Sequence, residues 1–153
     1  MNRLELCVPP VAVTGLSALA MWSVAQLAPG LGLPIPARGP FALALAIAGA
    51  AIAAAGVAAF RSAHTTVNPT TPDASAAVVD SGIYARSRNP MYVAFGLMLA
   101  GWAAYLGNGL SLALLPAFVL YLSRFQIAPE ERALTAKFGE RYLDYTRRVR
   151  RWL

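Results

Sequence analysis

Four apolar stretches follow one another along the chain, separated by polar or Pro/Gly-rich segments. They cover residues 8–28, 41–60, 90–106 and 110–124. The first two match the ~20 residues that a transmembrane helix requires, and the other two are near or below the lower limit of about 17. Between the last two, Gly107-Asn108-Gly109 is a turn short enough to allow only an antiparallel helical hairpin. The pattern predicts an all-α integral membrane protein with about four transmembrane helices in a single domain, residues 1–153.

The positions after the fourth stretch follow the period of an amphipathic helix. Apolar or aromatic residues recur every three or four positions, and the opposite face is mostly charged. The apolar stripe comprises Ile127, Leu134, Phe138, Tyr142, Tyr145, Val149 and Trp152, with Glu131 as its acidic member. We expect a helix over about residues 128–151 that lies at the membrane surface or packs beneath the bundle. Gly139 favours a bend or a close approach within it, because glycine lowers helix propensity by about 1 kcal/mol.

The composition and the distribution of charge support a membrane location. Hydrophobic residues make up 58% of the chain and charged residues 13%, against about 45–50% and 25% in soluble domains. Of the thirteen Lys and Arg residues, twelve fall before residue 8, within 61–88 or after residue 123, and the other is Arg38. The positive-inside rule therefore predicts that both termini are cytoplasmic. The basic tail could indicate nucleic acid, but its acids and aromatics recur at helical spacing, so we expect a lipid bilayer as partner and no nucleic acid.

Cysteine and histidine are too scarce for disulfide or metal chemistry. Cys7 and His64 are the single residues of their kinds. A disulfide within one chain is therefore impossible, and a zinc site would have almost no ligands to draw on. We expect no metal.

Candidate chemistry gathers where the third stretch begins, over residues 82–92. Asn89 is a favourable N-cap and Pro90 fits the first helical position, so a helix should begin here. The free N–H groups of a helix N-terminus favour an anion, and Arg86 and Arg88 add positive charge. The alternative is that these arginines only anchor the chain at the membrane surface.

A second group of polar and aromatic residues lies on the tail, predicted to face the same cytoplasmic side: Glu130, Glu131, Phe138, Tyr142 and Tyr145. Together with the arginine and tyrosines of residues 84–92, it offers a cation, carboxylates and aromatic faces. Such a set suits a zwitterionic ligand that carries a further positive centre. S-adenosylmethionine has these groups, but the residues alone leave it as one possibility among several. For Glu130 and Glu131, the alternative is stabilisation of the helix dipole.

The connector over residues 62–81 is long for a compact protein, and such segments often carry function. Its polar residues Thr65, Thr66, Asn68 and Pro69 could cover a site as a lid. A solvated linker is the alternative.

Two sequence motifs, separated by the predicted hairpin, extend over roughly the C-terminal two-thirds of the chain. The first consists of Ser81-Gly82-Ile83-Tyr84 and Ser87-Arg88-Asn89-Pro90-Met91-Tyr92. The second consists of Glu130-Glu131-x-x-Leu134, Phe138-Gly139-Glu140-x-Tyr142, Tyr145 and Arg151-Trp152. This arrangement resembles the superfamily of isoprenylcysteine carboxyl methyltransferases and phospholipid N-methyltransferases, and residues 65–69 resemble its bacterial branch.

The resemblance implies a methyltransferase of the bacterial inner membrane that binds S-adenosylmethionine between the third and fourth helices and the tail. The reaction it implies is transfer of a methyl group from sulfur to a nucleophile. It places Arg88 and Glu130 in the catalytic machinery, with Glu130 preferred over Glu131. The cofactor-binding residues that it implies are Tyr84, Arg88, Asn89, Pro90, Tyr92, Glu130, Glu131 and Tyr142.

Three departures from the motifs bear on the methyl acceptor. Isoprenylcysteine enzymes often carry histidine at the positions of Asn89 and Ala76, and an arginine is expected at the position of Gln126. We therefore expect a lipophilic or small nucleophile other than a prenylcysteine. The sequence leaves an amine, a thiol and a carboxylate open.

Two other functions are compatible with a small membrane bundle. A sterol-type reductase would need a nicotinamide site, for which the sequence has no nucleotide motif. A non-enzymatic bundle or small transporter is the main alternative to a methyltransferase. Coupled transporters usually carry an ionisable residue inside a span, and residues 8–28, 41–60, 91–106 and 110–123 contain no Asp, Glu, Lys, Arg or His.

Overall fold

A computed structural model describes residues 5–63 and 77–153 of the chain, and the described part is helical without β-strands. The possible lid residues Thr65, Thr66, Asn68 and Pro69, together with His64 and Ala76, lie outside the described residues. The long helices are α1 (Pro10–Leu27), α2 (Arg38–Ser62), α3 (Pro90–Leu106), α4 (Gly109–Leu122), α5 (Ala128–Phe138) and α6 (Glu140–Arg148). Shorter elements are the 3₁₀-helices η1 (Pro29–Leu31) and η3 (Gly82–Ala85) and the π-helix η4 (Ser123–Ile127).

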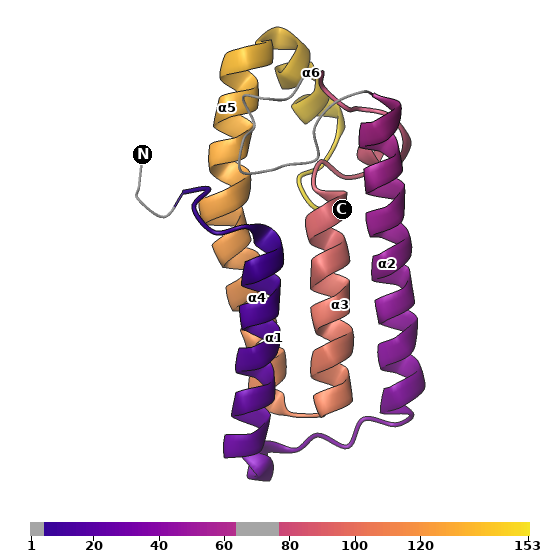
Figure 1. Cartoon of the computed structure of the whole chain (residues 1–153), viewed down its shortest axis with the longest axis vertical. Helices are drawn as coiled ribbons and strands as arrows, with labels where there is room; N and C mark the ends of the chain where they lie inside the picture. Colours follow the sequence, from indigo (N-terminus) through magenta and orange to yellow (C-terminus); the bar gives the residue numbers. More distant parts are fainter. Residues whose placement is uncertain (1–4, 64–76) are drawn as a thin grey trace.

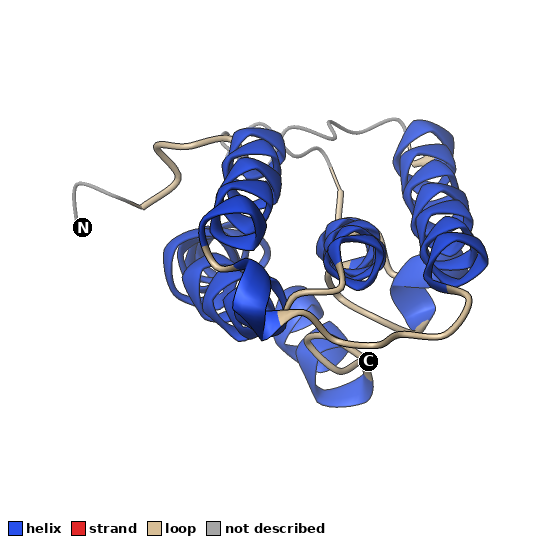
Figure 2. Ribbon diagram, turned by 90° about the horizontal axis from the view of Figure 1, so that it is seen from below, coloured by secondary structure: helices blue, strands red, loops and turns tan. Residues whose placement is uncertain are grey.

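The helix α3 is the centre of the bundle. It packs against α2 on one side and against α1 and α4 on the other (Figures 1 and 2). Gly107, with a φ of 59°, ends α3, and the Asn108 side chain accepts hydrogen bonds from the backbone N–H groups of Leu110 and Ser111. These bonds begin α4 at once, so α3 and α4 form a tight antiparallel hairpin.

Close backbone contact joins α2 to α3. A Cβ atom built on Gly49 would lie 2.8 Å from the carbonyl oxygen of Ala94, and one on Gly101 would lie 2.8 Å from that of Ala42. Only residues without a side chain allow this approach, which lipid-embedded helices need because lipid gives them no hydrophobic drive to associate.

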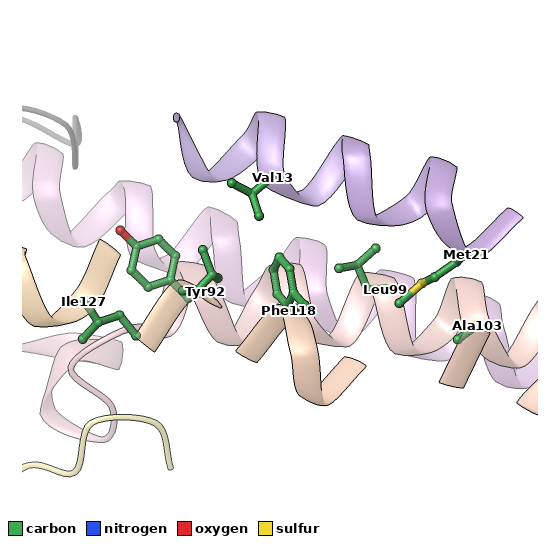
Figure 3. Close-up of a cluster of buried hydrophobic side chains, with 8 residues drawn as sticks. Val13, Met21, Tyr92, Leu99, Ala103, Phe118 and Ile127 are labelled. Carbon is green, nitrogen blue, oxygen red and sulfur yellow. The ribbon is translucent and has the colours of Figure 1, made fainter. Parts of the chain in front are cut away.

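A buried apolar cluster holds α1, α3 and α4 together (Figure 3). It comprises Val13, Met21, Tyr92, Leu99, Ala103, Phe118, Leu122 and Ile127. Polar side chains near the hairpin satisfy backbone carbonyls of α1 and its C-cap. The Nε1 atom of Trp102 donates to the carbonyl of Ala18 at 3.0 Å, and the Ser111 hydroxyl donates to that of Met21 at 2.8 Å.

The fourth apolar stretch and the first part of the tail, α5, form one continuous helical segment, Gly109–Phe138, of 30 residues. At 1.5 Å per residue, this segment is about 45 Å long, whereas the hydrocarbon core of a bilayer is about 30 Å thick. Within residues 5–63 and 77–153, three helical segments are long and apolar enough to cross a membrane: Pro10–Leu27, Arg38–Ser62 and Gly109–Phe138. The 17-residue α3 is apolar but shorter. We therefore take α1, α2, α3 and α4 as the membrane-spanning segments, and α5 and α6 as lying beyond them.

The structure confirms the all-α integral membrane fold predicted from the sequence. The tail differs in one respect, because the single helix expected over about 128–151 is divided. Gly139, with a φ of 55°, separates α5 from α6, and the chain becomes extended at Val149. The ψ of Gly139 is −132°, and glycine adopts this combination of φ and ψ far more easily than residues with a side chain, so the sequence marks the break at this position.

Candidate functional site

The elements that carry both sequence motifs meet at the end of the bundle opposite the α3–α4 hairpin (Figure 1). We call this the site end: η3, the first turn of α3, the helices α5 and α6, and residues 149–153. Backbone hydrogen bonds tie its parts together. The N–H of Arg88 donates to the carbonyl of Arg150 at 2.9 Å, and the Asn89 side chain donates to the carbonyl of Arg151 at 2.8 Å. Residues 62 positions apart in the chain therefore form one polar surface.

Glu131 is the centre of the ion pairs at the site end. Its Oε1 atom lies 3.1 Å from Nη1 of Arg88 and also accepts a 3.1 Å hydrogen bond from Nε of Arg151. Its Oε2 atom accepts a 2.5 Å hydrogen bond from Nη2 of Arg151. The side chains of Arg88 and Glu131 are only 14% and 16% exposed. Two guanidinium groups thus share one carboxylate that water barely reaches, which explains how a glutamate is accommodated on the apolar stripe.

Arg88 keeps one hydrogen-bond donor without a partner. Its Nε atom is buried and donates to no acceptor among the described residues. Such groups are rare, because an unmet buried donor costs about 1–3 kcal/mol. A carboxylate can bind guanidinium through two parallel hydrogen bonds, so this donor fits an anionic ligand group.

Glu130 has a different environment from its neighbour. It is half-buried, and its Oε2 atom accepts a hydrogen bond of 3.1 Å from the Tyr92 hydroxyl. Burial is the main cause that raises the pKa of the Glu130 carboxyl, the Tyr92 hydrogen bond lowers it and the charge of Glu131 raises it, and together they bring it from 4.5 to about 7. Glu130 therefore titrates near neutral pH, as a general base should.

Besides Tyr92, three buried tyrosines lie at the site end: Tyr84, Tyr142 and Tyr145. The Tyr145 hydroxyl donates to the carbonyl of Tyr84 at 2.8 Å, and the ring centroids of Tyr142 and Tyr145 are 6.0 Å apart. Burial raises the pKa of each of the three hydroxyls, so they stay protonated at neutral pH. The ring of Phe60 packs edge-on against Tyr84, with centroids 5.1 Å apart, and so joins α2 to the site end.

Asn89 and Pro90 lie where the sequence predicts, but Asn89 does not cap the helix with its side chain. Pro90 is buried and is the first residue of α3. The Asn89 amide makes no capping bond and donates to the carbonyl of Arg151 instead, while its backbone N–H donates to Ser87 Oγ at 3.1 Å. The bond to a carbonyl 62 residues away replaces the local one, so the residue fixes the C-terminal segment over the start of α3.

The structure also brings in residues that sequence reasoning did not select as site residues. Arg151 binds Glu131, and Ser87 is buried beside Asn89. Arg151 could have been selected from the sequence because it belongs to the second motif. Ser87 could have been selected because it directly precedes Arg88 in the first motif. Arg86, by contrast, is exposed. A shallow groove of about 500 Å³ opens the site end to the surface, and its lining is Ala128, Glu131, Arg132, Thr135, Ala136 and Arg151.

Comparison with known proteins identifies the family. The model of the phospholipid methyltransferase family matches residues 38–141, which include α2 to α5, the whole Arg88 motif and the first part of the Glu130 motif. The chain belongs to the phospholipid methyltransferase family. This membership confirms the resemblance to the wider isoprenylcysteine carboxyl and phospholipid methyltransferase superfamily. It makes the protein a membrane methyltransferase whose substrate is associated with the membrane.

A curated relative is an uncharacterised protein of Haemophilus influenzae. It is 44% identical to this chain over 63 residues, which are 41% of this chain and the whole of that protein. No solved structure matches the chain.

Proposed function

We propose that the protein uses S-adenosylmethionine to methylate a lipophilic or small nucleophile, an amine, thiol or carboxylate, at the cytoplasmic surface of a bacterial inner membrane. The observation that carries this proposal is the buried Nε donor of Arg88, a residue whose guanidinium already pairs with Glu131, in a chain that belongs to a family of methyltransferases. Bound S-adenosylmethionine would supply an electrophilic methyl group on a sulfonium centre.

The residues that fit the cofactor divide by charge. Arg88 donates hydrogen bonds to the carboxylate of the cofactor. The ion pair with Glu131 holds the Arg88 guanidinium in place. Glu130 accepts a hydrogen bond from the ammonium group of the cofactor. The buried rings of Tyr84, Tyr92 and Tyr142, with Asn89 and Pro90 at the start of α3, enclose this region and offer aromatic faces to a cation.

Positioning and exclusion of water are the main contributions of this chain to the reaction. Glu130 has a second role, because an amine or thiol nucleophile loses a proton as it gains the methyl group. A carboxyl group with a pKa of about 7 is partly ionised at neutral pH, and its carboxylate form can take that proton. Arg88 and Glu130 are accordingly the proposed catalytic residues.

The proposed orientation follows from the two ends of the bundle. Arg38 begins α2 at the hairpin end, whereas the arginines and the lysine of α5 and α6 lie at the site end. The positive-inside rule supports a cytoplasmic site end and two cytoplasmic termini. A lipophilic acceptor can then reach the groove beside Glu131 and Arg151 from the inner leaflet.

Calorimetric titration of S-adenosylmethionine and its demethylated product into the protein in nanodiscs tests the proposal. We expect saturable binding, weakened at least about tenfold by Arg88→Ala, since a hydrogen bond to a charged group contributes about 1.5–3 kcal/mol. The matched control is Arg38→Ala, which removes an exposed arginine at the opposite end of the bundle. Absence of binding to either ligand, with the protein folded, would contradict the proposed cofactor.

A further inference from the structure

The π-helix η4 controls the direction in which the two glutamates of α5 point. It covers Ser123–Ile127, and Glu130 and Glu131 follow it by three and four residues. A π-turn takes one more residue than an α-helical turn. π-Helices are rare overall, and those that occur often lie at functional sites. Without it, every downstream side chain would rotate by about 100° around the helix axis. Glu130 would then leave Tyr92, and Glu131 would leave Arg88.

An N-terminal strap, residues 5–9, lies across this π-helix. The backbone N–H of Leu6 donates to the carbonyl of Phe125 at 3.0 Å. The fully buried side chain of Gln126 donates through Nε2 to the carbonyl of Val8 at 2.5 Å. Both bonds join the strap to residues inside η4, where the regular helical pattern of backbone bonds is altered.

Glu5 in the strap bridges Arg124, which lies inside η4, and Arg132, which follows it in α5. Its Oε2 atom lies 2.7 Å from Nη2 of Arg132, and its Oε1 atom lies 3.2 Å from Nη1 of Arg124. The Glu5 side chain is only 4% exposed, whereas both arginines are more than half exposed. A nearly buried carboxylate with two partners is a specific arrangement, unlike the open ion pairs of α6.

The spacing of these arginines depends on the π-turn. Arg124 and Arg132 are eight residues apart, and in a continuous α-helix eight residues turn through about 800°, so the two would point about 80° apart. When the π-turn absorbs one residue, the separation corresponds to seven helical steps, or about 700°, and the two point within about 20° of one face. One carboxylate therefore reaches both arginines readily only when the π-turn is present.

We propose that Glu5 is a positioning residue: by bridging Arg124 and Arg132 it stabilises the π-turn of η4 and so directs Glu130 and Glu131 toward Tyr92 and Arg88. The effect on ligand binding rests on the proposed function above. The effect on the direction of α5 does not rest on the proposed function, because it concerns only how the helix is oriented. Gln126 occupies a position where related enzymes are expected to carry arginine. Its hydrogen bond to the strap also stabilises the π-turn.

Distances between spin labels test the direction of α5 without any ligand. Labels are placed on cysteines at Ser62→Cys and Ala136→Cys in a Cys7→Ser background, since both positions are exposed and lie on α2 and α5. A control pair uses Ser62→Cys and Leu120→Cys, because Leu120 precedes η4 and is 69% exposed. We expect Glu5→Ala to shift or broaden the 62–136 distances and to leave the 62–120 distances unchanged.

Titration of S-adenosylmethionine gives the second measurement. We expect Glu5→Ala to weaken binding about tenfold or more, because small misplacements of a binding group are costly, and Glu5→Asp to restore part of the loss. The matched control is Asp144→Ala, which removes an exposed carboxylate that pairs with Arg147 and does not touch η4. If Glu5→Ala does not fold, Arg124→Gln combined with Arg132→Gln replaces it, since it removes both bridges and leaves the strap intact.

The outcomes separate the two proposals. Unchanged 62–136 distances in Glu5→Ala, or an equal change in the 62–120 control, would overturn the positioning role. Altered 62–136 distances in a protein that binds no S-adenosylmethionine would support the positioning role and contradict the proposed cofactor. Altered distances with weakened binding would support both.

Discussion

The hairpin half of the bundle and the site end use polar groups in opposite ways. In the hairpin half, three polar side chains donate hydrogen bonds to backbone carbonyls of α1 or its C-cap: Trp102 to Ala18, Asn108 to Ala28 and Ser111 to Met21. At the site end, Glu131 is shared by two arginines and the Nε atom of Arg88 has no acceptor among the described residues. Polar groups in the first region hold helices together. Asn89 and Tyr145 also hold segments together in the second region, but that region in addition leaves a buried donor of Arg88 unpaired within the described part of the chain, which the proposed cofactor would use.

The two regions also differ in how closely their helices pack. In the membrane-spanning part, Gly49 and Gly101 bring the backbones of α2 and α3 into contact. At the site end, buried tyrosines and valines form a separate small cluster of Val78, Tyr142, Tyr145 and Val149. Changes in the first region should therefore lower stability alone, and changes in the second should lower ligand binding as well as stability.

The strongest test of this comparison is Glu131→Gln, which removes the shared carboxylate and leaves two guanidinium groups beside each other. Breaking one side of a mostly buried ion pair costs about 3 kcal/mol, so we expect a clear drop in the thermal unfolding temperature. The control Asp144→Asn breaks an exposed pair with Arg147 and should cost less than about 1 kcal/mol. Equal unfolding temperatures for the two variants would mean that the ion pairs of Glu131 contribute no more than surface pairs.

In the membrane-spanning part, Gly101→Ala should lower the free energy of unfolding by about 2 kcal/mol. The added Cβ would lie 2.8 Å from the Ala42 carbonyl oxygen, so α2 would have to shift. Gly96→Ala, in the same helix, is the matched control because its Cβ would meet no atom within 4 Å. Unfolding in one detergent compares the variants, and S-adenosylmethionine affinity of the folded fraction should stay unchanged. If Gly101→Ala and Gly96→Ala are equally stable, the close contact between α2 and α3 at Gly101 does not contribute to stability as we infer.

The raised pKa of Glu130 predicts a pH dependence of stability. Between pH 4.5 and about 7, the unfolded chain has released the Glu130 proton and the folded protein still holds it. The free energy of unfolding should therefore fall as pH rises through this window, by at most about 1.4 kcal/mol per pH unit, and level off above it. Glu130→Gln should remove this component from unfolding curves measured between pH 4.5 and 8. A wild-type curve parallel to that of Glu130→Gln would show that Glu130 titrates normally.

The smallest expected effect is that of Trp102→Phe in the hairpin half. It removes the hydrogen bond from Nε1 to the Ala18 carbonyl and keeps an aromatic ring against α1, so we expect a loss of about 1 kcal/mol. Thermal unfolding measures the loss. Binding of S-adenosylmethionine should be unaffected, and a change in affinity would mean that the two regions are coupled.

Much of the fold could be predicted from local sequence properties. The apolar stretches, the Gly107-Asn108-Gly109 turn and the start of α3 at Pro90 each depend on length or on one residue's backbone preference. The division of the tail at Gly139 follows from the same kind of preference, although the pattern of apolar positions continues across it. Local properties also brought Arg88, Glu130, Glu131 and the tyrosines forward as candidates.

The sequence by itself determined that this is a helical membrane protein and which residues carry its candidate chemistry, because hydrophobic length, helix period and motif order are properties of neighbouring residues. Only the tertiary structure decided how those residues are paired. Glu131 rather than Glu130 binds Arg88, Arg151 completes that pair, and the strap residue Glu5 bridges the π-turn. Each of these contacts joins residues 20 to 127 positions apart, and a one-residue π-turn rotates a whole helix. No periodic pattern in the sequence records such a rotation, since the residues that stabilise it come from the other end of the chain.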